Sequence, residues 1–258
     1  MEPIIIPLRP ILIFVVVLAR VGGLVTFAPF WSNKSAPMQV RVTLALALAL
    51  VLAPAVAPRL VTPPSDFVGL TTVIVGELVI GCIFGFVGRL IFSALELAAQ
   101  VLGFQLGLSL ASIIDPATRA QTTAIGTVAQ MLGLMVMLAA DGHHWLLTAT
   151  VRSFETVGPD SFTFSPELAR LLLRLSADAL AVGVALAAPA IVVLLAVEFI
   201  LAIAGRAAPQ LQVMLLGFPV KFIVGIWLVG AALYFTPGAV RGALSAMKIG
   251  LNRALNAM

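Results

Sequence analysis

The stretch "LAVGVALAAPAIVVLLAVEFILAIA", Leu180 to Ala204, decides the fold class of this chain. Its single ionisable residue is Glu198, and the rest is apolar or glycine and proline. A helix needs about 20 mostly apolar residues to cross a bilayer, so this stretch is long enough to span one. Pro189 lies inside the stretch and predicts a kink. We therefore predict a membrane-spanning helix here.

The composition of the whole chain agrees with a membrane protein. The chain has 258 residues, of which 61% are hydrophobic and 10% are charged. Soluble domains are typically about 45–50% apolar and about 25% charged. No polar linker or charge run divides the sequence, so we predict one integral membrane domain over residues 1–258. The net charge of +4 is spread along the chain and aromatic residues are not interleaved with it, which argues against a nucleic-acid partner.

Other apolar runs predict further helices. They cover about residues 11–27, 42–57, 67–92 with an unbroken continuation to 107, 123–140 and 213–235. The second run alternates Leu and Ala, which would fit a strand on period alone. Leu and Ala are good helix formers and the run is apolar on both faces, so we predict a helix. The fold class is therefore all-α, with about six apolar helices.

Local signals predict where helices begin and end. "SPE", Ser165 to Glu167, places a capping serine, a first-turn proline and an acid at a helix start. "DGHHW", residues 141–145, predicts a helix stop and an interfacial turn, with the side chains of the two adjacent histidines pointing apart.

The C-terminal tail, residues 237–258, contains basic residues and no acid. Its apolar residues are expected roughly on one face, and they are Leu244, Met247, Ile249, Leu251 and Leu255. We predict an amphipathic helix lying at the cytoplasmic interface of the membrane.

Several ionisable residues lie in or beside the apolar runs: Arg20, Glu77, Arg89, Glu198, Arg206 and Lys221. Such a group at the centre of a membrane helix costs about 2.5–3.5 kcal/mol. Residues near helix ends can reach the headgroups, whereas the others face a bundle interior, a partner or a wet cavity. Their number predicts polar neighbours, above all other subunits. Glu198 and Arg206 are too far apart on one helix to pair, so we expect a tertiary partner for Glu198.

Glycines recur at helical spacing in the third run, at Gly81, Gly85 and Gly88, and later at Gly103 and Gly107. Small residues at this spacing allow close approach of membrane helices.

Known catalytic signatures are missing from the chain. No HExxH, GxSxG, Walker A or GxGxxG pattern occurs, and Cys82 is alone in an apolar run. We predict that the protein is not an enzyme and binds no cofactor or metal.

One polar interruption stands apart: "GLSLASIIDPATRAQT", Gly107 to Thr122. It combines small and turn-forming residues, and Asp115-Pro116 prevents the preceding helix from continuing. From the residues alone, an ordinary connecting or re-entrant loop is the simpler interpretation.

Four stretches in order resemble the FliR family, the export-gate membrane proteins of the bacterial flagellum, whose injectisome relatives are called SctT. They are "LARVGGLVTFAPFWSNKSAPMQVRVTLALALAL" (18–50), "FQLGLSLASIIDPATRAQTTAIG" (104–126), "DGHHWLL" (141–147) and "EFILAIAGRAAPQLQVMLLGFPVKFIVG" (198–225). The "GHH" element favours the flagellar branch.

This resemblance implies partners and a location. Family members join FliP and FliQ in a hetero-oligomeric helical channel in the bacterial inner (cytoplasmic) membrane, within the flagellar basal body. FlhB associates with the cytoplasmic side, and FlhA forms the surrounding export machine. The channel exports unfolded flagellar proteins, and family helices fold back as hairpins that partly leave the plane of the lipids.

The resemblance also assigns residues. The segment at about 107–122 matches the family's plug loop, in which Leu108, Leu110, Ile113 and Ile114 would form an apolar constriction and Asp115 and Pro116 a turn. From the residues themselves, rather than from the resemblance, we predict intramembrane polar and assembly roles for Arg20, Glu77, Glu198, Arg206, Pro209, Gln210, Gly217, Phe218, Pro219 and Lys221. We expect Pro209 and Pro219 to break helices and a helical hairpin to pack on neighbouring subunits, with Arg206 and Lys221 meeting carboxylates or carbonyl ends.

Two alternatives stay open. In the first, the chain is an injectisome homologue. In the second, it is a small-solute or ion transporter that uses Glu77 and Glu198 as intramembrane cation sites. Transporters usually contain repeated halves, and we find no matching pair in this sequence.

Overall fold

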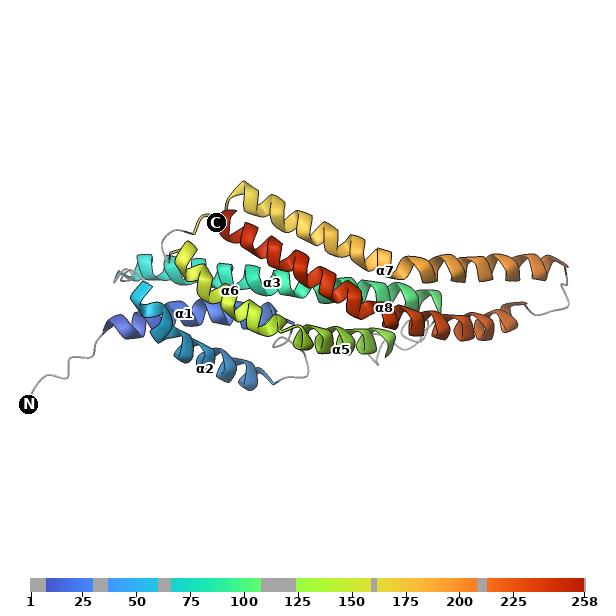
Figure 1. Ribbon diagram of the computed structural model, residues 1–258, viewed down its shortest axis with the longest axis horizontal. Helices are drawn as coiled ribbons and strands as arrows, with labels where there is room; N and C mark the ends of the chain where they lie inside the picture. The colour runs from blue at the N-terminus through green and yellow to red at the C-terminus, as the bar shows by residue number, and fades with distance from the viewer. Residues whose placement is uncertain are drawn as a thin grey trace, which may run out of the picture. The chain divides into compact units, whose positions relative to one another are not determined.

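The computed structural model describes residues 8–29, 37–59, 66–107, 124–158, 162–207 and 213–257. Every regular element in these ranges is helical (Figure 1), which confirms the all-α prediction. The helices are α1 (Leu8–Phe27), α2 (Met38–Val56), the short 3-10 helix η1 (Ala57–Arg59), α3 (Phe67–Gln105), α5 (Ala124–Ala139), α6 (Gly142–Thr156), α7 (Pro166–Ala207) and α8 (Val213–Ala257).

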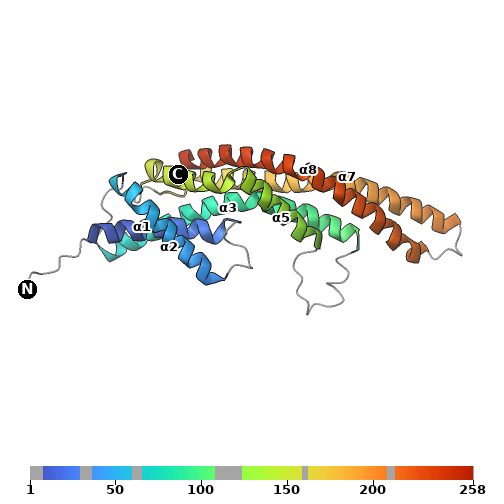
Figure 2. The same ribbon diagram turned by 60° about the horizontal axis from the view of Figure 1, so that its bottom comes forward.

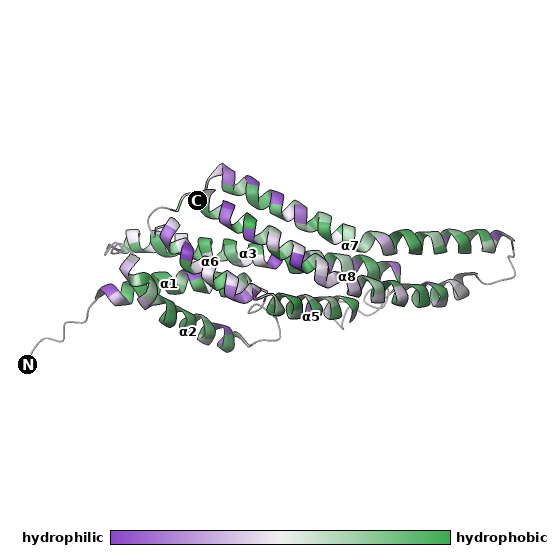
Figure 3. Cartoon of the chain, in the orientation of Figure 1, coloured by the Kyte–Doolittle hydropathy of each residue, from purple (hydrophilic) through white to green (hydrophobic). Residues whose placement is uncertain are grey.

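Within the described ranges, four helices are long and apolar enough to cross a membrane: α1, α2, α3 and α7. The number rises to six if α5 with α6, and α8 with its internal bend, each form one broken span. In Figure 3, α1, α2, α5 and the second half of α7 are largely green, hydrophobic ribbons, whereas α6 and the first half of α7 carry many hydrophilic residues. The protein is therefore a helical membrane protein, as its composition predicts.

The chain packs as two compact units. The first unit comprises residues 1–90, 141–175 and 245–258, and the second comprises residues 91–140 and 176–244. Helices α3, α7 and α8 each contribute one part to each unit. The packing of each unit is described separately.

In the first unit, α1 and α2 lie side by side (Figures 1 and 2) and share an apolar core. Ala45 and Ala49 of α2 are buried in that core, whereas Leu46 and Leu50 are 41% and 68% exposed. The small residues recur four apart and so lie on one face of the helix. The Leu/Ala alternation is thus helical: Leu48 and Leu52 also pack against this core, whereas Ala47 is exposed, so burial follows the helix face and not the residue type.

Glycines bring α1 and α3 into close contact in the same unit. A Cβ atom on Gly23 would collide with the backbone of Leu78 and Cys82, and one on Gly81 would collide with the backbone of Arg20. A Cβ atom on Gly85 would likewise collide with Phe27 and with the backbone of Leu24. These contacts confirm the close approach predicted from glycine spacing. Gly88 is less crowded, because a Cβ atom added there would lie 3.5 Å from its nearest neighbour, a side-chain carbon of Leu146.

The start of α7 follows its sequence signal. The Ser165 hydroxyl oxygen accepts a hydrogen bond from the backbone N–H of Leu168 at 3.0 Å. Pro166 is the first helical residue and Glu167 lies in the first turn. The cap satisfies a backbone donor that has no partner within the helix, and the acid lies at the positive end of the helix dipole.

The C-terminal tail differs from its prediction in two ways. It is the continuation of α8 rather than a separate helix, and α8 passes through Pro237. Leu244, Met247, Leu251 and Leu255 are buried, but Ile249 is 54% exposed and lies off their face. Ala254 packs with Ile83 of α3 and Leu168 of α7. Protein therefore covers the apolar face that we expected at the membrane interface.

Pro219 was also expected to break a helix, and that expectation is wrong. Pro219 lies inside α8, which continues through it. A proline removes one backbone hydrogen bond, and membrane helices tolerate this loss where neighbouring groups satisfy the freed carbonyl. Pro189 likewise lies inside α7.

The stop at "DGHHW" is confirmed, because α5 ends at Ala139 and Asp141 adopts a left-handed backbone conformation with φ of 53°. A new helix, α6, begins directly after it at Gly142. No apolar run in the sequence predicted α6.

Candidate functional site

The first unit contains a buried polar cluster around Arg20 of α1. The Arg20 Nε–H donates to Oε2 of Glu77 at 2.5 Å, and Nη2 donates to Oε1 at 2.7 Å. Arg20 is 0% exposed and Glu77 is 1% exposed. Both carboxylate oxygens are therefore engaged by one guanidinium in a two-pronged pair, the geometry that holds an arginine and a carboxylate most firmly.

Helix α6 and Val157, the residue directly after it, complete the cluster. Arg20 Nη1 donates to the Ser153 hydroxyl at 2.7 Å, and Nη2 also donates to the carbonyl of Val157 at 3.2 Å. The Phe154 ring centroid lies 3.8 Å from the guanidinium carbon. Four of the five N–H groups of Arg20 thus have acceptors, and an aromatic ring adds a cation–π contact. Groups of the protein itself therefore compensate the charge.

Three sequence features position this cluster. Gly81 lets α3 approach the backbone of Arg20, and Glu77 lies one helical turn before Gly81 on the same side. Ser153 is fixed in turn because its hydroxyl donates to the carbonyl of Thr150 at 2.6 Å. Arg20 and Glu77 therefore face the interior of a bundle rather than lipid or headgroups.

The second unit holds another ion pair, between Lys221 of α8 and Glu198 of α7. The side chains are 24% and 42% exposed. Gly217, one turn earlier in α8, is buried with Leu201 as its nearest neighbour. Helices α7 and α8 thus form a hairpin in this unit, and Lys221 is the tertiary partner of Glu198.

The other residues predicted for assembly have different surroundings. Arg206 is exposed in the last turn of α7, where a cation favours the helix dipole. Phe218 is exposed, and its ring stacks on Phe222 with centroids 6.1 Å apart. Pro209 and Gln210 lie outside the described residues. The structure therefore brings four of the predicted residues together in two pairs that were not predicted, Arg20 with Glu77 and Glu198 with Lys221.

All six predicted plug residues, Leu108, Leu110, Ile113, Ile114, Asp115 and Pro116, lie outside the described residues. The helices on either side of them are described. Gly107, just past the end of α3, has a φ of 74°, a conformation that suits glycine at a helix end. Leu106 is 1% exposed and packs on Gly225 of α8.

Helices α3 and α5 pack together within the second unit. Gly133 of α5 lies against Leu95 and Phe92 of α3. Nearer the connecting segment, Leu102 of α3 and Ile125 of α5 line the same small cavity of about 30 Å³. Helices α3 and α5 are therefore packed together up to the ends that border residues 108–123.

The part of the buried cluster that α6 supplies was not predicted from the sequence. Ser153, Phe154 and Val157 follow a stretch of mixed polarity that no apolar run marks as a helix. One sequence pattern could have predicted this helix, because small or apolar residues recur in it at helical spacing. The buried residues of α6 include Leu146, Ala149, Thr150, Ser153 and Phe154.

The "DGHHW" turn corrects another expectation. The ring centroids of His143 and His144 lie 4.1 Å apart, so their side chains do not point apart. Both residues are in the first turn of α6, where side chains lean back toward the helix start. With Asp141 they offer nitrogen and oxygen atoms within 4.8 Å of one another, a spacing compatible with a metal ion. Asp141 and His144 are largely exposed, and we keep the prediction of no metal at this turn.

Comparison with known proteins adds the family. The sequence profile described as "Bacterial export proteins, family 1" matches residues 11–247. The chain is 33% identical over 216 residues to "Flagellar biosynthetic protein FliR" of Escherichia coli K12, covering 83% of this chain and 81% of the relative. It is also 33% identical over 220 residues to the protein of that name from Caulobacter vibrioides, covering 84% and 86%. The Bacillus subtilis protein of that name is 28% identical over 216 residues, covering 82% of each chain.

The matched region contains the Arg20 cluster, the α3–α5 pair and the α7–α8 hairpin. It covers nearly every described helix, and the similarity to the first two relatives extends over more than four-fifths of each chain. The chain therefore belongs to the FliR family of bacterial export proteins.

Proposed function

We propose that this chain is a subunit of the flagellar protein export gate in the bacterial inner membrane. With FliP and FliQ it forms the channel through which unfolded flagellar proteins leave the cell, and FlhB and FlhA are further partners. Family membership supports this proposal, together with the flagellar biosynthetic role that the names of the relatives state.

The observation that carries the proposal is the Glu198–Lys221 pair on the α7–α8 hairpin. The hairpin exposes many large apolar side chains, among them Phe199, Ile200, Ile223 and Trp227, which are 70%, 64%, 61% and 80% exposed. An ion pair that stays partly exposed among them would be costly in lipid. A partner subunit or a wet channel resolves that conflict, so the hairpin is an assembly surface.

The paired carboxylates disfavour the transporter alternative. A proton or cation site needs a carboxylate that is available to the ion. Both oxygens of Glu77 accept hydrogen bonds from Arg20, and Glu198 is paired with Lys221. Both charges are thus already compensated within the chain.

The proposal includes a plug formed by the segment of about residues 107–122. Its flanking helices α3 and α5 are packed together, and Leu106 is anchored on α8. Movement between open and closed states would then be confined to the segment itself. Its Leu and Ile side chains would close the channel by excluding water.

Co-purification tests the proposed function. The tagged chain would be expressed with the FliP and FliQ homologues of its own genome, extracted in mild detergent and separated by gel filtration. We expect one complex that contains all three proteins. Recovery of the chain alone, beside an intact complex of the two homologues, would refute the proposal.

A matched pair of variants locates the assembly surface. Lys221→Glu places two acids together on the hairpin and should reduce recovery of the complex. Arg241→Glu makes the same charge change at an exposed position of α8, and it should leave recovery of the complex unchanged. Equal recovery of the two variants would count against the hairpin as the surface.

A further inference from the structure

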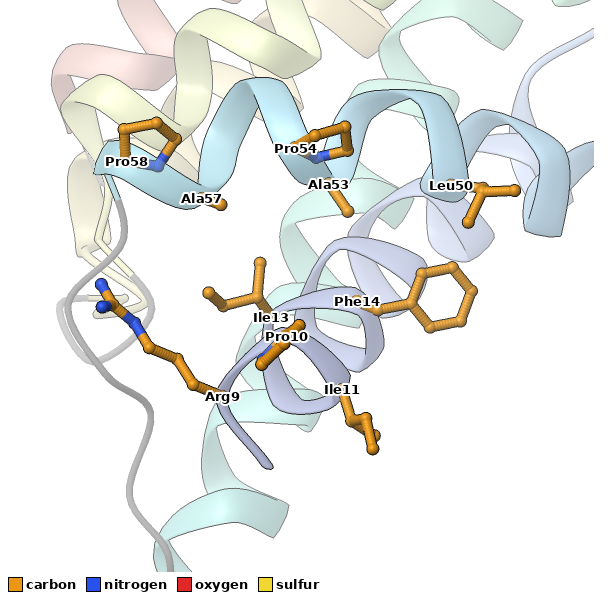
Figure 4. Close-up of a pocket in the computed structure, with 10 residues that line it drawn as sticks. All are labelled: Arg9, Pro10, Ile11, Ile13, Phe14, Leu50, Ala53, Pro54, Ala57 and Pro58. Atoms are coloured by element: carbon orange, nitrogen blue, oxygen red, sulfur yellow. The ribbon is translucent and has the colours of Figure 1, made fainter. Parts of the chain in front are cut away.

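The first unit has a groove between the start of α1 and the end of α2 (Figure 4). Its volume is about 740 Å³, within the range of about 300–1,000 Å³ found for small-molecule sites. It is lined by Pro10, Ile11, Ile13 and Phe14 from α1, by Leu50, Ala53 and Pro54 from α2, by Ala57 and Pro58 from η1, and by Arg9.

The lining changes character from one end of the groove to the other. In Figure 4, Arg9 lies at the end beside Pro58, and Phe14 and Leu50 lie at the opposite end. Arg9 is exposed, and it is the single charged residue among the described residues that line the groove. The groove therefore offers a long apolar wall with one cation at its mouth, which fits a ligand with an apolar chain and an anionic end.

The surroundings identify the source of such a ligand. Both helices that form the walls are long and apolar enough to cross a membrane. Leu50 and its neighbour Val51 are 68% and 70% exposed, so this side of α2 is open. A groove of this kind on membrane helices is reached from the bilayer, where phospholipids are the abundant ligands.

We propose that this groove binds an anionic phospholipid, with an acyl chain along the apolar wall and the phosphate at Arg9. The apolar lining stabilises binding by burying the acyl chain of the lipid. This contribution does not depend on the headgroup. Arg9 contributes the preference for an anionic headgroup, because basic residues near membrane helices attract such lipids. The groove lies on the first unit, and none of its lining residues belongs to the Arg20 cluster.

Photocrosslinking of the full-length protein tests this site. The protein would be reconstituted in vesicles that contain a trace of phosphatidylglycerol or phosphatidylcholine with a diazirine on the acyl chain. After irradiation, mass spectrometry would map labelled peptides. We expect labelling of the peptides that contain residues 9–14 and 50–58, with phosphatidylglycerol favoured about five-fold, the effect of one basic residue.

Two variants distinguish the contribution of the lipid headgroup to binding from that of the acyl chain. Arg9→Gln should bring the ratio of the two lipids close to one and retain labelling by phosphatidylcholine. Ala53→Trp fills the groove and should abolish most labelling by both lipids. Ala55→Trp is its matched control on the same helix, because Ala55 is exposed and does not line the groove.

Three results would overturn the proposal. One is labelling of the two peptides at background level in the wild type, as expected if a protein segment occupies the groove. Another is equal labelling of the Ala53→Trp and Ala55→Trp proteins. The third is an unchanged lipid ratio in Arg9→Gln. Arg9 is exposed, so its variant keeps the test valid even if Ala53→Trp does not fold.

Discussion

Arg20 and Glu77 form a two-pronged ion pair between α1 and α3 in which both side chains are fully buried. The pair lies where glycines bring the two helices into contact, and α6 supplies its remaining acceptors. Such a pair contributes less to net stability than its geometry suggests, because desolvation offsets the attraction. The pair joins α1, α3 and α6, and an arrangement of these helices that lost one partner would leave a buried charge uncompensated.

Glu77→Gln should destabilise the first unit by about 3–5 kcal/mol, because Arg20 keeps a buried charge without its counterion. Thermal unfolding in detergent should show a melting temperature lower by several degrees. Arg20→Met combined with Glu77→Leu removes both charges and should recover most of the loss. Arg241→Met, at an exposed position, is the control. A melting temperature of Glu77→Gln equal to that of the control would show that the pair is unimportant.

Replacing each of two adjacent glycines of α1 by alanine should change the stability of the protein in opposite directions. A Cβ atom added at Gly22 would have open space around it, whereas one at Gly23 would meet the backbone of Leu78 and Cys82. Gly22→Ala should stabilise the helix by about 0.5–1 kcal/mol, since alanine has less backbone freedom to lose. Gly23→Ala should cost about 1–3 kcal/mol because the helices must separate. Both are measured as shifts in melting temperature, and shifts of the same sign would contradict the predicted α1–α3 contact.

The Glu198–Lys221 pair predicts a charge-swap rescue. Glu198→Lys places two cations on the hairpin and should reduce recovery of the complex with FliP and FliQ homologues. The double variant Glu198→Lys with Lys221→Glu restores opposite charges and should recover it. For such partly exposed pairs the direct coupling is only about 0–1 kcal/mol. Failure of the double variant to improve on Glu198→Lys would show that the pair itself is not what assembly requires.

The proposed plug predicts a leak. Deletion of Leu110 to Ile114 should let ions cross vesicles that contain the assembled complex, because the apolar constriction that excludes water is lost. Ion flux and gel filtration of the same preparation are the measurements. Ser109→Ala with Ser112→Ala changes the same segment but keeps its apolar side chains, and should remain tight. An intact complex with the deletion that leaks no more than this control would rule out the sealing role.

Much of the fold was predictable because it depends on local chemistry. The apolar stretch from Leu180 to Ala204 is long enough to span a bilayer, and it lies within α7. Ser165 and Pro166 start that helix through a hydrogen bond and a fixed φ, both of which act within one turn. Gly81 and Gly85 predicted a close helix contact because only the absence of a side chain permits one.

Features that depend on contacts between distant residues were not predictable in this way. Helix α6 has a mixed composition and was missed, although it carries Ser153 and Phe154 of the buried cluster. The tail was expected at the membrane surface, but protein covers its apolar face. An amphipathic pattern states that one face will be buried, and it does not state what buries it.

The sequence by itself determined that this is an all-α membrane protein of the FliR family, since length, hydropathy and ordered motifs are properties of the chain. It also identified Arg20, Glu77, Glu198 and Lys221 as charges that need partners. Only the tertiary structure decided that Arg20 pairs with Glu77 and Glu198 with Lys221. The physical reason is that the cost of burying a charge is local, whereas its compensation comes from whichever helix packing brings into hydrogen-bonding distance.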